Sequence, residues 1–196
     1  MITRSQLILK RIFDFILAVL LLPILIIPVI VLVVLASMDT GQWGVFSQIR
    51  VGQHGKLFLI YKLRTLRAEQ HRLGHLEKSA TRFGKFLRQT KLDELPQIYN
   101  VLIGDMSFVG PRPDLQGFAD KLKGEDRIIL IVKPGITGPA TLKYKDEERV
   151  LERQKDPEHY NRTIIWVDKV KINKMYVQDY TFSLDLTLIL KSIINK

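Results

Sequence analysis

The chain has 196 residues, of which 46% are hydrophobic, and it carries a formal net charge of +10 with no cysteine. This length suits a single domain with its own hydrophobic core. The lack of cysteine excludes disulfides and thiolate metal sites, and the positive charge favours a phosphate-rich partner such as a nucleotide, a nucleic acid or an anionic membrane.

The four histidines do not predict a metal site. His71 and His75 are spaced as i and i+4 but lack a Glu-Xaa-Xaa-His context, and His54 and His159 stand apart. We interpret all four as surface residues. Aromatic residues do not alternate with basic ones as they do in tracts that stack on bases, so no nucleic-acid partner is expected.

The N-terminal region contains an uncharged stretch from Phe15 to Ser37 that is long enough to span a bilayer as a helix. A signal peptide would be shorter and would end in a better cleavage site. A simple spanning anchor fits the hydropathy, but Pro23 and Pro28 fall inside the stretch and both of its flanks are basic. We therefore predict a re-entrant helix that breaks near Pro23 and returns to the same side, with Asp14 paired to a neighbouring cation.

Two short apolar segments, residues 45–49 and 57–61, are separated by a glycine-containing turn and predict a β-hairpin. Lys62 and Arg64 follow at alternating spacing, so they share one face of the strand end. They are either a pair of phosphate contacts or a solvated strand edge.

Residues 67–79 are polar and charged, which predicts a helix or a loop. Over residues 82–91, cations recur every third position beside apolar side chains, as in an amphipathic helix. Such a helix can bury its phenylalanines in a core or lie in a membrane interface with its cations at the headgroups. Next to a membrane element we favour the interface.

Two adjacent carboxylates, Asp93 and Glu94, precede Pro96. Proline is tolerated only in the first turn of a helix, so we predict a helix that begins at about residue 92 or 93 and ends at Gly104. Acidic residues are common at such positions simply as caps. However, Arg88 lies one turn upstream and makes the same turn suitable for a phosphate, and paired carboxylates raise one pKa or recruit a divalent cation.

The segment Gly110-Pro111-Arg112-Pro113 is stiff, because each proline fixes its own backbone and restricts the residue before it. A guanidinium presented in this way suits bidentate phosphate binding, and the alternative is a structural turn with a solvent-facing arginine. The loop at 133–139 is rich in glycine and proline but lacks the P-loop and dinucleotide-binding signatures.

The C-terminal part predicts two helices. Asp156-Pro157 opens one that continues to about Tyr176, and residues 182–194 form an amphipathic pattern that can also rest on a membrane.

Together these segments resemble the bacterial sugar transferases, the monotopic polyprenyl-phosphate phosphoglycosyl transferases that begin glycan assembly. The resemblance covers almost the whole chain and lies in residues 10–14, 46–52, 61–65, 92–97, 100–102, 104–107, 109–113 and 134–138. One departure is Leu22-Pro23, where the family often has a serine before the proline of the membrane helix.

The resemblance implies an α+β fold that is mostly helical. It would consist of a re-entrant membrane helix over residues 1–38 and a catalytic domain over 39–196, with a small β-hairpin and interfacial helices around the active site. The protein would be monotopic, on the cytoplasmic face of the bacterial inner membrane.

The implied reaction depends on Mg²⁺ and transfers sugar 1-phosphate from a UDP-sugar to undecaprenyl phosphate, releasing UMP. Asp93 would be the nucleophile that forms a covalent phosphosugar intermediate, and Glu94 would support the metal or handle a proton, with both carboxylates close to Mg²⁺. The substrate phosphates would contact Arg88, Arg112, Lys62 and Arg64. Pro111, Pro113 and Pro23 would shape the site. Nucleotide or sugar contacts are assigned to the region of residues 137–148, and within it to Thr137, Gly138 and Lys143.

Two other classes fit part of the sequence. A membrane-tethered basic module for nucleic acid or anionic lipid explains the charge and the membrane helix, and a membrane scaffold explains only the amphipathic segments. Neither explains a carboxylate pair among cations or the rigid Pro-Arg-Pro. The sequence does not determine which sugar is transferred or the glycan pathway, and it leaves a homo-oligomer open.

Overall fold

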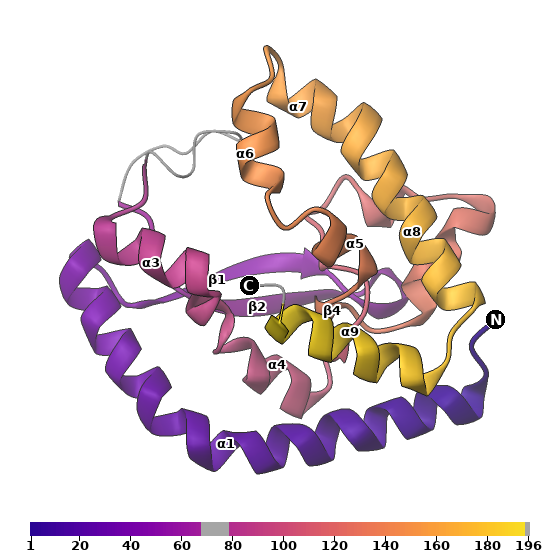
Figure 1. Cartoon of the computed structure of the whole chain (residues 1–196), viewed down its shortest axis with the longest axis horizontal. Helices are drawn as coiled ribbons and strands as arrows, with labels where there is room; N and C mark the ends of the chain where they lie inside the picture. Colours follow the sequence, from indigo (N-terminus) through magenta and orange to yellow (C-terminus); the bar gives the residue numbers. More distant parts are fainter. Residues whose placement is uncertain (68–78, 195–196) are drawn as a thin grey trace.

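The computed structural model of the chain describes residues 1–67 and 79–194, and these are mostly helical (Figure 1). The helices are α1 (Arg4–Thr40), α3 (Arg82–Thr90), α4 (Gln97–Ile103), α5 (Pro139–Lys143), α6 (Glu147–Glu152), α7 (Pro157–Tyr160), α8 (Trp166–Gln178) and α9 (Phe182–Ile194). The strands are β1 (Val45–Val51), β2 (Leu57–Leu63), β3 (Ser107–Val109) and β4 (Gly135–Thr137). Shorter helical turns are η1 (Gln53–Gly55), η2 (Leu92–Glu94), η3 (Ala119–Lys121), η4 (Gly124–Ile131) and the π-helical η5 (Asn161–Ile165). The predicted mostly helical class with a small β-hairpin is confirmed.

Helix α1 has defined ends and an exposed apolar middle. It begins with a capping box in which Thr3 and Gln6 exchange side-chain and backbone hydrogen bonds, and it ends at Gly41 in the left-handed conformation. The helix is long and apolar enough to cross a membrane, and little of its most apolar stretch is covered by the rest of the chain. Its side chains therefore suit a lipid environment.

The predicted break near Pro23 is replaced by a bend. Helix α1 is one continuous element through Pro23 and Pro28, and Figure 1 shows that it runs along the lower edge of the molecule and then turns upward. A proline removes one backbone donor and pushes away the carbonyl four residues earlier, while the flanking hydrogen bonds can persist. The expectation of an interrupted helix is therefore wrong for this chain.

Both ends of α1 are held by the folded part of the chain. Near the N-terminus, Lys10 Nζ lies 2.5 Å from Asp185 Oδ2 in α9, and both side chains are buried. Near the C-terminus, Asp39 accepts a hydrogen bond from Thr81, which caps α3. The Ser37 hydroxyl also accepts a hydrogen bond from Gly44 N at 2.8 Å.

The predicted pairing of Asp14 with a neighbouring cation is not the contact that forms. Asp14 Oδ1 accepts a hydrogen bond from Phe108 N at 3.0 Å, whereas Lys10 pairs with Asp185. One turn of helix separates Lys10 from Asp14, and the docking of α9 supplies Lys10 with a closer carboxylate.

The predicted hairpin is confirmed and is two residues longer in each strand than expected. Strands β1 and β2 pair antiparallel from Val45↔Leu63 to Val51↔Leu57. The connection needs a positive φ at His54 as well as at Gly55, which turns the chain tightly between the strands.

A second, parallel pair of short strands was not predicted. Strand β3 pairs with β4, with Ser107 opposite Gly135 and Val109 opposite Thr137. The loop expected over residues 133–139 thus contains β4. The glycines of this segment suggested an irregular loop. They are present instead because two backbones approach closely here.

The remaining predicted helices are present. Helix α3 follows Thr81, whose hydroxyl accepts from Gly84 N at 2.8 Å, and it buries Leu87 while leaving Phe86 about half exposed. The helical run opened by Asp156 extends through α7, η5 and α8 to Gln178. The polar segment at 67–79, including His71 and His75, lies outside the described residues apart from its two ends.

Asp93 and Glu94 are called the dyad below, and residues 92–97, which contain them, the dyad segment. The core of the chain has three parts. One lies between the N-terminus, β3, α8 and α9, and a second between α1, β2 and α4. The third packs β1 against η3, η4 and α8. Ala18, in α1, belongs to the second part, so α1 is packed onto α4, the helix that follows the dyad.

Candidate active site

Asp93 and Glu94 lie in η2, a single tight turn between α3 and α4. Helix α3 ends at Lys91, which has a φ of 59°, and α4 begins only at Gln97. A helical turn does begin at residue 92, as predicted, but it is the tight turn η2, and the regular α-helix begins only at Gln97. Pro96 has no N–H to donate to the carbonyl of Leu92, so the turn closes instead through Leu95 N at 3.2 Å. The predicted end at Gly104 is confirmed, with a φ of 92°.

Asn100 fixes α4 to strand β2. Its Nδ2 donates to the Leu59 carbonyl at 2.7 Å, and its Oδ1 accepts from Tyr61 N at 3.2 Å. The side chain is fully buried. This amide sets the distance between the dyad segment and the strand that carries Lys62.

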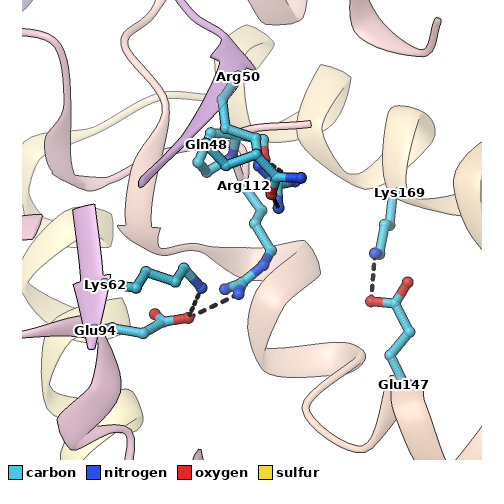
Figure 2. A network of polar contacts seen from close by, with 8 residues as sticks. Gln48, Arg50, Lys62, Glu94, Arg112, Glu147 and Lys169 are labelled. Atoms are coloured by element: carbon cyan, nitrogen blue, oxygen red, sulfur yellow. Dashed lines mark hydrogen bonds and ion pairs between the residues drawn. The ribbon is translucent and has the colours of Figure 1, made fainter. Parts of the chain in front are cut away.

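Glu94 brings two predicted phosphate-binding residues together (Figure 2). Its Oε1 accepts from Lys62 Nζ at 2.8 Å and from an Arg112 terminal nitrogen at 2.7 Å. Burial alone would raise the pKa of Glu94, but the charges and hydrogen bonds of Arg112 and Lys62 hold it well below its usual range. The carboxylate therefore stays ionised and keeps the two cations side by side.

Asp93 is buried next to this cluster but takes no part in it. The residue is 7% exposed, and its Oδ1 accepts no hydrogen bond within the described part of the chain. Burial raises the pKa of Asp93, Lys62 opposes this, and the Glu94 carboxylate adds to it. The arrangement leaves one carboxylate satisfied and its neighbour without a hydrogen-bond partner.

The segment that carries Arg112 is fastened from both sides. Gly110 N donates to the Thr137 carbonyl at 2.9 Å, and Gly135 N donates to the Pro111 carbonyl at 2.8 Å. Arg50 donates to the Pro113 carbonyl at 3.2 Å. The predicted stiffness of Pro111 and Pro113 thus receives support from β1 and β4, and the guanidinium of Arg112 is aimed at Glu94 (Figure 2).

Arg88 and Arg64 are placed differently from Lys62 and Arg112. Arg88 is in the last turn of α3, where its charge acts to lower the pKa of Asp93. The Nε of Arg64 donates to the Trp43 carbonyl at 2.8 Å, and its guanidinium lies over the ring of Phe46. Arg64 follows the end of β2, so its side chain is drawn to the segment after α1.

The predicted nucleotide or sugar contacts separate into two places. Thr137 and Gly138 adjoin the Arg112 segment, because the Thr137 carbonyl binds Gly110 N and a Cβ on Gly138 would lie 2.1 Å from the Gly110 carbonyl oxygen. Lys143 is half-exposed and pairs with Asp168 of α8 at 2.6 Å.

Two charged residues near Arg112, Asp114 and Lys169, were missed by the sequence reasoning, and Glu147 was included only in the broad region of residues 137–148. Glu147 and Lys169 form an ion pair at 2.5 Å, and Figure 2 shows the pair across from Arg112. Asp114 follows Pro113, and burial raises its pKa to about 7 against the opposing charges of Lys169 and Arg50. Asp114 could have been predicted from its position directly after the Pro-Arg-Pro segment. Nothing in the sequence indicated that Glu147 contacts Lys169.

An apolar groove of about 250 Å³ lies beside the dyad segment. It is lined by Leu22, Leu25, Ile26, Val29, Val45, Tyr61, Pro96, Ile98 and Tyr99. Tyr61 and Pro96 are sequence neighbours of Lys62 and of the dyad, and the α1 residues begin directly before Pro23. The groove therefore connects the exposed apolar surface of α1 with the polar cluster.

The described residues contain no cluster of three or more ligating side chains that could hold a metal ion. Magnesium, however, is usually held by one or two carboxylates together with substrate phosphates. Asp93 makes no hydrogen bond among the described residues, and Glu94 uses Oε1 for two cations. The donor set fits a magnesium ion that arrives with a diphosphate.

Comparison with known proteins decides the family. A protein-family model described as bacterial sugar transferase matches residues 5–196. The chain belongs to this family. The family inferred from the motifs is thus confirmed, and the chain is an enzyme rather than a non-catalytic binding module.

The relatives of this sugar transferase differ in length. It is 34% identical over 186 residues to the uncharacterized sugar transferase EpsL of Bacillus subtilis (strain 168), covering 93% of this chain and 84% of that protein. It is 30% identical over 198 residues to UDP-N-acetylgalactosamine-undecaprenyl-phosphate N-acetylgalactosaminephosphotransferase of Aeromonas hydrophila, covering 94% of this chain and 43% of that protein. It is also 32% identical over 206 residues to UDP-glucose:undecaprenyl-phosphate glucose-1-phosphate transferase of Klebsiella pneumoniae, covering 97% of this chain and 41% of that protein.

Proposed function

We propose that this sugar transferase moves sugar 1-phosphate from a UDP-sugar to undecaprenyl phosphate, giving a lipid diphosphate sugar and UMP in the first membrane step of glycan assembly. The observation that carries the proposal is the contrast within the dyad. Glu94 holds Lys62 and Arg112 at 2.8 and 2.7 Å, while Oδ1 of the adjacent Asp93 is buried and accepts no hydrogen bond from the described residues. This is a cation pair for phosphate oxygens beside an unengaged nucleophile.

The two chemical steps use Asp93 in turn as nucleophile and as leaving group. An Asp93 oxygen attacks the phosphorus that bears the sugar, and the phosphorus–oxygen bond to UMP breaks, so UMP departs with the bonding electrons. An oxygen of the lipid phosphate then attacks the acyl phosphate, whose bond to Asp93 breaks and restores the carboxylate. Covalent catalysis of this kind divides one difficult displacement into two.

The cations stabilise charge that moves during these steps. Arg112 and Lys62 are positioned to contact the phosphate oxygens of the donor and of the departing UMP, and Arg88 is one turn from Asp93 on the acceptor side. Glu94 keeps the two cations in place, which we prefer to a proton-accepting role because its pKa is held low. Thr137 and Gly138 stay our candidates for nucleotide or sugar contacts, and Lys143 and Arg64 would first have to leave their present partners.

Magnesium would be held by the diphosphate together with Asp93 and the less occupied oxygen of Glu94. When bound, it neutralises charge on the diphosphate. The residues of the chain then orient the phosphates against Asp93.

The groove beside the dyad supports a polyprenyl acceptor. It is apolar, it is lined in part by α1, and it reaches Pro96, next to Asp93 and Glu94. We propose that the first isoprene units of undecaprenyl phosphate lie there, so that the phosphate meets the cations while the chain stays among apolar side chains.

The membrane arrangement belongs to the same proposal. Residues 1–38 would enter one leaflet and return, and residues 39–196 would form the catalytic domain on the cytoplasmic face of the inner membrane. The bend of α1 and the attachment of both of its ends to the folded part of the chain support this arrangement.

The function is tested with detergent-solubilised protein, a panel of UDP-sugars, Mg²⁺ and undecaprenyl phosphate, with UMP as the readout. We expect UMP with at least one donor, and a complete lack of UMP across the panel would refute the proposal.

Asp93→Asn tests the nucleophile in the same assay. We expect a loss of turnover of about 10⁴-fold or more and no trapped phosphosugar adduct by intact-protein mass spectrometry, because the amide is a poor nucleophile. An unchanged melting temperature is the control for folding. Substantial turnover by Asp93→Asn would remove Asp93 from this role.

A further inference from the structure

Two buried atoms without hydrogen-bond partners lie in the dyad segment. Among the described residues, the unpartnered buried side-chain atoms include Asp93 Oδ1 and Gln97 Nε2. Gln97 is 2% exposed, so its amide N–H groups cannot turn to bulk water. A buried donor and a buried acceptor each cost folding free energy when they have no hydrogen-bond partner. Two such atoms in one short segment therefore require an explanation.

The backbone makes these two residues neighbours. Leu95 N bonds to the Leu92 carbonyl at 3.2 Å and Ile98 N to the Leu95 carbonyl at 3.1 Å, so the chain winds continuously from η2 into α4. Residues three and four positions apart lie side by side on such a winding. Gln97 is four residues after Asp93 and three after Glu94.

Within the described residues, Asp93 Oδ1 is the buried acceptor of this segment that has no hydrogen-bond partner. Glu94 Oε1 already accepts from Lys62 and Arg112, and the Asn100 amide is bound to β2 on both sides. Glu94 lies three residues before Gln97, and Asn100 lies three residues after it. Both contact β2, so the chain is held in place on each side of Gln97.

We propose that Gln97 is a positioning residue whose amide N–H donates a hydrogen bond to Asp93 Oδ1 when the donor substrate binds. The bond fixes the rotation of the carboxylate, so that Oδ2 points at the phosphorus while Oδ1 becomes the carbonyl oxygen of the acyl phosphate. Gln97 does not touch the reacting phosphorus and acts only through Asp93. The inference rests on the proposed function, because it assigns Gln97 to the step in which UMP is released.

The test compares two replacements of Gln97 in the full-length protein. Gln97→Met has a similar length but no donor, and we expect kcat to fall about 10- to 100-fold with KM for the UDP-sugar and for undecaprenyl phosphate within about threefold. Release of UMP in a single turnover without lipid acceptor should slow by the same factor. Gln97→His restores an N–H donor at a similar reach, and we expect it to recover kcat to within about fivefold of wild type.

Asn173→Met is the matched control. Asn173 is 4% exposed in α8 and, like Gln97, has a buried side-chain atom without a partner, but it lies outside the dyad segment. We expect wild-type kcat and KM for this variant. Melting temperatures of all variants separate a loss of positioning from a loss of folding.

The outcomes separate the two levels of the proposal. If wild type releases no UMP with any donor, the proposed function fails and the role of Gln97 fails with it. If wild type and Gln97→Met release UMP at the same rate, only the role of Gln97 is overturned. It is also overturned if Gln97→Met loses activity through a raised KM or a lowered melting temperature and Gln97→His restores nothing.

Discussion

At the residue scale, neighbouring carboxylates in one turn have opposite environments. Glu94 is bound by two cations, which lower its pKa, while burial raises the pKa of Asp93. The difference arises from side-chain direction, because Lys62 and Arg112 approach Glu94 from β2 and from the Pro-Arg-Pro segment. Neighbouring groups whose environments push their pKa values apart are a common feature of active sites.

The pairing around Glu94 predicts the effect of removing its charge. Glu94→Gln leaves Lys62 and Arg112 close together without a counter-charge, so we expect the free energy of unfolding to fall by about 1–3 kcal/mol. Turnover should fall about 100-fold or more as the cations move apart. Thermal unfolding and UMP release measure the two effects. Glu125→Gln, which removes one partner of an exposed ion pair with Lys174, should change neither.

Asp114 predicts a pH dependence of stability. Burial raises its pKa to about 7, whereas an ordinary aspartate has a value of 3.8. The folded protein therefore binds this proton more tightly than the unfolded chain, and the contribution of Asp114 to the free energy of unfolding falls as the pH rises between these values.

The measurement compares melting temperatures of wild type and Asp114→Asn between about pH 5 and pH 8, followed by the fluorescence of Trp43 and Trp166. We expect the melting temperature of wild type to fall relative to that of the variant as the pH increases. Parallel curves for the two proteins would show that Asp114 has no raised pKa.

At the element scale, the Arg112 segment is positioned by the close approach of two backbones. Gly110, Gly135 and Gly138 allow this approach, because a Cβ at any of them would lie within 2.4 Å of a main-chain atom of the facing segment. These glycines are thus required by spacing rather than by flexibility.

Gly138→Ala tests this packing. The added methyl group would lie 2.1 Å from the Gly110 carbonyl oxygen, so we expect a loss of about 1–3 kcal/mol of unfolding free energy together with reduced turnover, as Arg112 is displaced. Chemical denaturation and UMP release are the measurements. Pro139→Ala, at the first position of α5, is the control and should retain most of the stability. A fully stable and active Gly138→Ala variant would contradict the proposed packing.

At the scale of the whole molecule, α1 is bent and attached at both ends to one folded unit. Lys10 is bound to Asp185, and Asp39 to Thr81, with the exposed apolar stretch between them. A straight spanning helix would place its two ends on opposite sides of a bilayer, where they could not contact the same compact unit.

The topology can be measured because the chain has no cysteine. Single cysteines at Ser5 and Gln42 should react with a membrane-impermeant maleimide from the same face of sealed vesicles, whereas one at Ile27 should be protected by lipid. Labelling of positions 5 and 42 from opposite faces would show that α1 spans the membrane.

The sequence by itself determined the local elements of this protein. Two apolar segments around a glycine-containing turn predicted the hairpin, helical periodicity predicted α3 and α9, and the uncharged stretch predicted α1. Each of these signals depends on the conformation and burial of residues close together in the sequence. The motifs also pointed to Asp93, Glu94, Lys62 and Arg112 as candidate site residues, and the structure brings the last three into contact. The helical start near residue 92 was predicted correctly, but the separation of η2 from α4 was not, because the effect of Pro96 on the preceding turn depends on how the chain closes around it.

Only the tertiary structure decided which of these residues meet. Lys62, Glu94 and Arg112 are far apart in the sequence, and their contact depends on the Asn100 link between α4 and β2 and on the pairing of β3 with β4. The same holds for Lys10 with Asp185, where the docking of α9 replaced the local pairing expected for Asp14. Long-range contacts of this kind arise from the packing of separate elements. Periodicity shows which face of an element is buried, but not which distant side chain that face meets.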